Sequence, residues 1–146
     1  MIEKHCVSLE LSKKLKELGV PQKSEFYWLR GADPKEGIWT IVHKQIMEDV
    51  IYDKRNLPTS AYLASELGEM LPNYINIPYK NGKTKSPNHF LVLKKYPVDK
   101  HNWGIRYYRT SRSINIEKRA DTEADARAKM LIYLIENSLF KLEDLV

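Results

Sequence analysis

The segment TEADARAKMLIYLIEN, residues 122–137, has a helical pattern that requires one wide face to be buried. Thr122 followed by Asp125 predicts a capped N-terminus, because the hydroxyl can accept a hydrogen bond from the backbone three residues later. The apolar stripe is small in its first half and bulky in its second. Since an exposed stripe of this width favours aggregation, we predict that the helix covers a sheet. The stripe consists of Ala124, Ala128, Leu131, Ile135 and Leu139, widened by Ile132 and Leu134.

Two further segments have the spacing and end signals of amphipathic helices. Residues 9–18 place three leucines on one face, and Gly19 supplies the residue type that commonly ends a helix. Residues 61–71 repeat the apolar pattern after Ser60 and stop before Pro72. We therefore predict three helices in the chain.

Short runs rich in aromatic and β-branched residues lie between the predicted helices, and Gly, Pro and Asn separate them. EFYWL and GIWTIV are predicted to form a hairpin, and DVIYD a third, shorter strand. In WGIRYYR, alternation places Trp103, Ile105 and Tyr107 on one face of a strand and Arg106 and Tyr108 on the other. This is typical of a half-buried antiparallel strand.

These patterns predict one α+β domain over residues 1–146. We expect an antiparallel sheet of about five to seven strands and three helices, with the first and last helices packed on the sheet. A chain of 146 residues, 42% of them hydrophobic, can bury a core without disulfide or metal support.

The N-terminus and the single cysteine indicate an intracellular environment. Glu3 and Lys4 interrupt the apolar run that a signal peptide needs, and Cys6 has no second cysteine with which to form an intrachain disulfide. No window approaches the roughly 20 apolar residues of a membrane helix. We expect a cytoplasmic protein without a membrane partner.

The net charge of +5 is unevenly distributed. Residues 80–119 contain eleven Lys and Arg but only two acidic residues, Asp99 and Glu117. Such a segment favours nucleic acid or an acidic protein as partner, although a solvated surface gives the same composition. Aromatic residues are interleaved with the cations, as in proteins that hold single-stranded nucleic acid by stacking. The residues predicted to bind are Lys94, Lys95, Arg106, Tyr108, Arg109 and Arg112.

Three blocks of the chain, SLELSKKLKELGVPQKSEFYW, SAYLASELGEMLP and TEADARAKMLIYLIEN, resemble short proteins encoded in bacteriophage genomes and in prophage regions of bacteria. The blocks cover about a third of the chain, and the basic segment lies outside them. The resemblance implies a phage or prophage context and an accessory role. It supplies no catalytic residues.

LKELGVPQKSEFYWL also has the turn of a helix-turn-helix motif. Two features argue against that interpretation. Glu25 occupies a position where the second helix needs an apolar residue, and the following FYW favours a strand.

Two alternatives to a nucleic-acid binder remain open. Residues 122–146 could form the interface of a homo-oligomeric structural protein. Glu48, Asp49 and Asp53 could hold Mg²⁺ for a metal-dependent phosphodiesterase. The four histidines share no metal-ligand spacing. We therefore assign no catalytic residue, no metal ligand and no cofactor.

Overall fold

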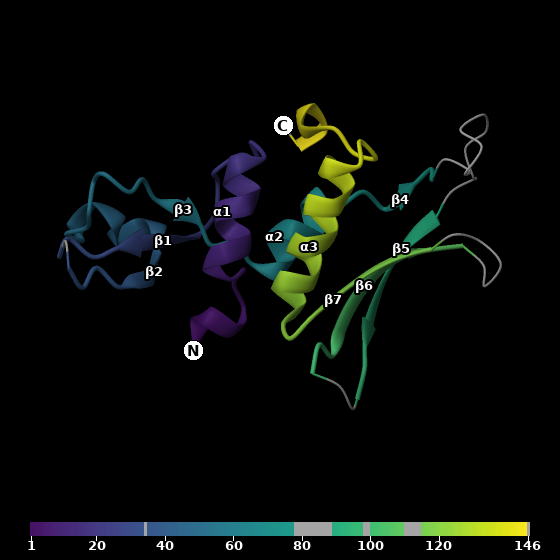
Figure 1. The fold of residues 1–146 in the computed structure, drawn as a ribbon, viewed down its shortest axis with the longest axis horizontal. Helices are drawn as coiled ribbons and strands as arrows, with labels where there is room; N and C mark the ends of the chain where they lie inside the picture. The colour runs from purple at the N-terminus through teal and green to yellow at the C-terminus, as the bar shows by residue number, and fades with distance from the viewer. Residues whose placement is uncertain (34, 78–88, 98–99, 110–114, 146) are drawn as a thin grey trace.

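Two antiparallel sheets lie on either side of a group of helices (Figure 1). The computed structural model describes residues 1–33, 35–77, 89–97, 100–109 and 115–145. One sheet has the strand order β2-β1-β3 and the other β4-β5-β6-β7. The predicted α+β class and the antiparallel pairing are confirmed. The strands divide between two sheets, however, where the sequence pattern predicted one.

The three-stranded sheet contains the predicted hairpin. β1 (Phe26–Arg30) lies in the middle and pairs with β2 (Trp39–His43) and β3 (Thr59–Ser60). A 3-10 helix, η2 (Lys44–Asp49), follows β2. Of the predicted strand DVIYD, Tyr52 alone makes a bridge, to Gly31. Residues 20–25 after α1 contain no second helix and lead directly into β1, so the arrangement of a helix-turn-helix is absent from this segment.

The three predicted helices are present as α1 (Leu9–Glu17), α2 (Ala64–Met70) and α3 (Glu123–Glu136). Gly19 follows α1 with a φ of +87°, a conformation that glycine adopts without strain. The hydroxyl of Thr122 accepts a hydrogen bond of 3.2 Å from the backbone N–H of Asp125, as predicted. α2 begins later than predicted, because Ser60 belongs to β3.

The last helix is the centre of the hydrophobic core. α3 packs on β6 and β7, and α1 and α2 pack on α3 (Figure 1). α1 also contacts the three-stranded sheet, at β3. Most of the apolar stripe of α3 is therefore buried inside the molecule. The buried residues of α3 are Ala124, Ala126, Ala128, Met130, Leu131, Ile132 and Leu134.

The four-stranded sheet is a meander of β4 (Tyr74–Ile75), β5 (His89–Lys95), β6 (Trp103–Tyr108) and β7 (Ile116–Ala120). Ile105, Tyr107 and Ile116 point into the core on the side of α3. The buried hydroxyl of Tyr107 donates a hydrogen bond of 2.6 Å to the carbonyl oxygen of Pro72. The alternation predicted for β6 is confirmed.

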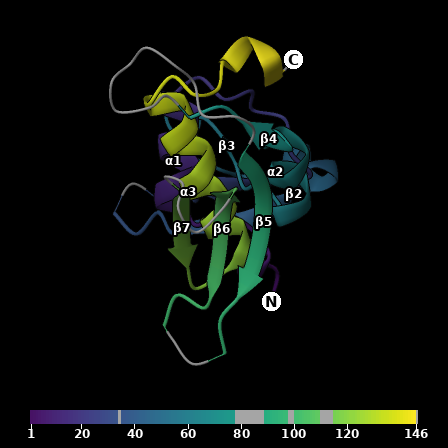
Figure 2. The same cartoon turned by 90° about the vertical axis from the view of Figure 1, so that its right-hand side faces the viewer.

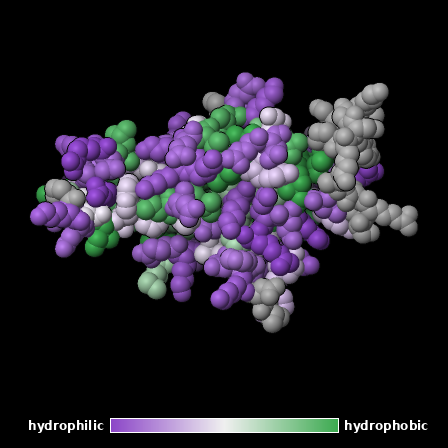
Figure 3. Space-filling model, in the orientation of Figure 1, coloured by the Kyte–Doolittle hydropathy of each residue, from purple (hydrophilic) through white to green (hydrophobic). Residues whose placement is uncertain are grey.

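Short 3-10 helices lie near both ends of the chain, η1 (Ile2–Lys4) and η3 (Leu142–Leu145). Hydrophilic side chains cover much of the face seen in Figure 3, and the apolar groups on it form separate patches. Among the helices that the structure describes, none combines the length and the apolar character needed to cross a membrane.

Candidate nucleic-acid interface

The side of the four-stranded sheet that points away from α3 is called here the outer face. Figure 2 views the molecule from the side of this sheet, with α3 behind the strands. Residues that lie opposite one another on neighbouring antiparallel strands share a face, so the register arranges the outer face in three rows. The aromatic row is Tyr74, Phe90 and Tyr108; the central row is Val92, Arg106 and Glu117; the basic row is Lys94, Gly104 and Arg119.

The aromatic row places three rings on three adjacent strands. Tyr74 is 54% exposed and Phe90 is 56% exposed, although both belong to a sheet with a well-formed core on its other side. Tyr108 is half-buried, and the guanidinium carbon of Arg106 lies 4.6 Å from its ring centroid. The aromatic row therefore places three rings on the outer face, and the guanidinium of Arg106 lies beside one of them.

The basic row is organised around the ring of Tyr96, which follows β5. The ring lies over Gly104, where an added Cβ would come within 2.9 Å of Tyr96 Cε2. Lys94 Nζ lies 4.6 Å and the guanidinium carbon of Arg119 3.6 Å from the ring centroid. The hydroxyl of Tyr96 donates a hydrogen bond to Glu117. The cations at this end of the face are therefore held in place by an aromatic side chain.

Positive charge exceeds negative charge on the outer face. The three rows contain the cations Lys94, Arg106 and Arg119 and one carboxylate, Glu117, which lies 3.4 Å from Arg119 Nε. Arg106 Nε is buried and has no hydrogen-bond partner in the described part of the chain. An anion that approached this face would therefore meet a net positive charge.

The structure brings three of the six predicted binding residues together: Lys94, Arg106 and Tyr108. Lys95 faces the opposite side of the sheet, where its Nζ lies 5.1 Å from the ring centroid of Trp103. Adjacent residues of a strand point to opposite faces, so Lys94 and Lys95 cannot share the outer face. Arg109 lies beyond the end of β6, and its backbone N–H donates to Asn115 Oδ1. Arg112 lies outside the described residues.

Four aromatic or cationic residues of the outer face were not among those predicted to bind: Tyr74, Phe90, Tyr96 and Arg119. Period-2 alternation in HFLVLKK could have placed Phe90 with Lys94, because they are four residues apart. Tyr74 gave no such signal, since β4 has two residues and its position depends on pairing with β5.

Among the acidic residues predicted as possible Mg²⁺ ligands, Asp53 is bound by side chains of the protein itself. Asp53 is buried, and its carboxylate accepts hydrogen bonds from Arg30 (3.2 Å), Arg55 (2.9 Å) and Asn56 (2.9 Å). The hydrogen bonds from Arg55 hold the pKa of this carboxyl well below its usual range. Within the described residues, no group of three or more His, Cys, Asp or Glu could hold a metal ion. We therefore interpret Asp53 as a structural residue that forms ion pairs with Arg30 and Arg55.

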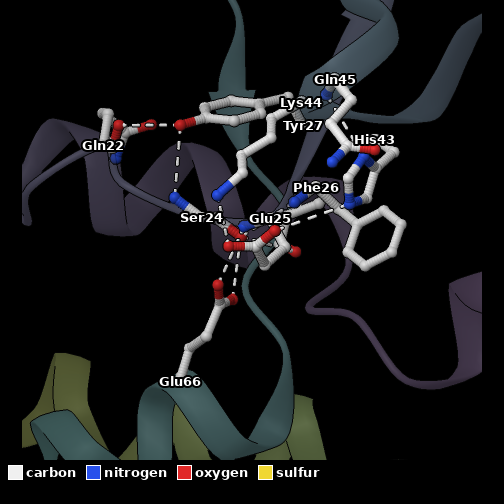
Figure 4. Close-up of polar contacts among 10 residues, drawn as sticks. Gln22, Ser24, Glu25, Phe26, Tyr27, His43, Lys44, Gln45 and Glu66 are labelled. Carbon is white, nitrogen blue, oxygen red and sulfur yellow. Dashed lines mark hydrogen bonds and ion pairs between the residues drawn. The ribbon is translucent and has the colours of Figure 1, made fainter.

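A second polar cluster joins α2 to the loop before β1 (Figure 4). The Glu66 carboxylate accepts hydrogen bonds from Ser24 Oγ (2.8 Å) and from the backbone N–H groups of Glu25 (2.9 Å) and Leu63 (2.7 Å). Glu25 Oε1 in turn accepts a hydrogen bond of 2.5 Å from Lys44 Nζ, and this hydrogen bond lowers the pKa of Glu25. Because protein groups already bind both oxygens of Glu66, we interpret this cluster as structural.

No protein-family model matches this chain, and no curated protein or solved structure matches it either. The functional argument therefore depends on the geometry and charge of the outer face.

Proposed function

We propose that the chain is a non-enzymatic accessory protein that binds nucleic acid through the outer face of its four-stranded sheet. The observation that carries this proposal is the placement of exposed rings and excess cations on one face, with the core on the other. The phage or prophage context stays a prediction from the resemblance of the three helical blocks.

Electrostatics favours a polyanion as the partner. A protein that neutralises phosphates with Lys and Arg releases the counterions of the nucleic acid, so its affinity falls as salt rises. Lys94 is exposed, and Arg106 and Arg119 are partly exposed on the same face. A partner with regularly spaced phosphates could contact several of these cations simultaneously.

The structure provides a matched pair of variants for the test. Lys94→Glu reverses a charge on the outer face, and Lys95→Glu makes the same change one residue away on the opposite face. We expect a fluorescent oligonucleotide to bind wild type in low salt, to bind much more weakly in moderate salt, and to lose more affinity with Lys94→Glu than with Lys95→Glu. Fluorescence anisotropy at two salt concentrations measures this. Equal losses from the two variants, or affinity that does not depend on salt, would contradict the proposal.

A further inference from the structure

We propose that the ligand of the outer face is single-stranded, and that it lies across the strands with unpaired bases stacked on the aromatic row. This inference rests on the proposed function and specifies its substrate class. The row contributes one ring from each of β4, β5 and β6, in register, so it runs perpendicular to the strands.

The spacing of the rings favours unpaired bases. Neighbouring strands in a sheet lie roughly 4.8 Å apart. Bases in a stacked duplex strand rise by about 3.4 Å per nucleotide, and their faces are covered by neighbouring bases. A chain that places one base on each ring must therefore be extended and partly unstacked. Single strands adopt such a conformation readily, and aromatic side chains stack on every base type.

The position of Arg106 indicates where the phosphates of a bound single strand would lie. The central row lies about 7 Å from the aromatic row, two residues along each strand. Arg106 lies in this row, and its guanidinium contacts the ring of Tyr108. Lys94 and Arg119 lie one row further in the same direction. Bases on the aromatic row would thus direct their phosphates toward the cations of the other two rows.

The remaining polymer classes fit this face less well. Duplex DNA is usually read by a helix or a two-stranded ribbon inserted into a groove, and the rows of the outer face are carried on the flat side of a sheet. A protein partner would use the apolar area of Phe90 without requiring its π face. A substitution of Phe90 that removes the ring but keeps an apolar side chain therefore distinguishes a nucleic-acid partner from a protein partner.

Phe90→Leu and Leu93→Ala provide that experiment. Phe90 is exposed on the outer face, whereas Leu93 is 42% exposed on the opposite face of the same strand. We expect single-stranded DNA or RNA of mixed sequence to bind wild type more tightly than the matching duplex in low salt. We also expect Phe90→Leu to weaken binding roughly 5- to 150-fold, the range for loss of one stacked base, with Leu93→Ala unchanged. Circular dichroism establishes that both variants are folded.

The outcomes separate this inference from the function on which it rests. Preference for duplex, or binding by Phe90→Leu that equals wild type, would overturn the single-strand assignment and leave nucleic-acid binding intact. Absence of binding to single strands and to duplex in low salt would remove the proposed function and this inference together. Retained single-strand preference with a selective loss in Phe90→Leu supports both.

Discussion

Gly104 and Tyr96 are sterically dependent on each other: the ring of Tyr96 lies where a side chain at position 104 would project. An added Cβ would lie 2.9 Å from Tyr96 Cε2 and 3.1 Å from Glu117 Oε1. The ring cannot move freely, because Lys94 and Arg119 contact it and Glu117 accepts its hydroxyl hydrogen bond. The absence of a side chain at Gly104 is thus a condition for the arrangement of the cations.

We predict that Gly104→Ala lowers the free energy of unfolding by about 1–3 kcal/mol, the usual cost of overpacking. In a Tyr96→Ala background the same substitution should cost much less, because the ring is gone. Urea denaturation of wild type, both single variants and the double variant gives the coupling energy. A coupling energy near zero would mean that the contact between Tyr96 and Gly104 does not restrain the fold.

Glu66 is predicted to contribute to stability through its three hydrogen bonds to the loop before β1 and to the start of α2. Glu66→Ala removes the carboxylate, so the donor groups of Ser24, Glu25 and Leu63 lose their acceptor. We expect a loss of about 2–3 kcal/mol in the free energy of unfolding. The exposed Glu69, on the same helix, provides the control, since Glu69→Ala should change the free energy of unfolding by less than about 0.5 kcal/mol. Equal effects in urea denaturation would contradict the role assigned to Glu66.

The features that could be predicted from the sequence are local. The cap at Thr122, the end of α1 at Gly19 and the alternation in β6 depend on residues within a few positions of one another. Local hydrogen bonds and steric preferences determine such features, so the sequence pattern identifies them directly.

The division into two sheets and most of the outer face could not be predicted in this way. β3 and β4 have two residues each, too few to show a period-2 pattern, and their pairing depends on tertiary contacts. Composition grouped Lys94 with Lys95, although the pleat separates them. It also omitted Tyr74, which joins Phe90 and Tyr108 through strand register alone. The candidate site is defined by register, which is a property of the assembled sheet.

Cys6 is predicted to be unreactive in the folded protein. It is 1% exposed, and burial raises the pKa of its thiol from 9.0 to about 11. Because the thiolate is the reactive form, this shift lowers the fraction of reactive thiolate at pH 8 by roughly 100-fold, and burial slows access of the reagent further. Labelling with a chromogenic disulfide reagent at pH 8 should be slow in buffer and fast in guanidinium chloride. Similar rates in the two solvents would show that the N-terminal segment opens readily.

Asp53 is predicted to make folding sensitive to acid. Its folded pKa lies below the ordinary value of 3.8, chiefly because Arg55 donates hydrogen bonds to the carboxylate, so folding favours the ionised form. The resulting stabilisation is present above pH 3.8 and is lost as the pH falls from there toward the folded pKa.

We therefore expect Asp53→Asn to have a lower Tm than wild type at pH 7, with the difference becoming smaller between pH 4 and pH 2. Asn lacks the charge that pairs with Arg30 and Arg55, and protonation of Asp53 removes the same charge from wild type. Asp49→Asn, at an exposed position at the end of η2, controls for a general effect of net charge. Thermal unfolding followed by circular dichroism across this pH range makes the comparison. A Tm difference that stays constant with pH would show that hydrogen-bond geometry, and not the charge of Asp53, stabilises this part of the sheet.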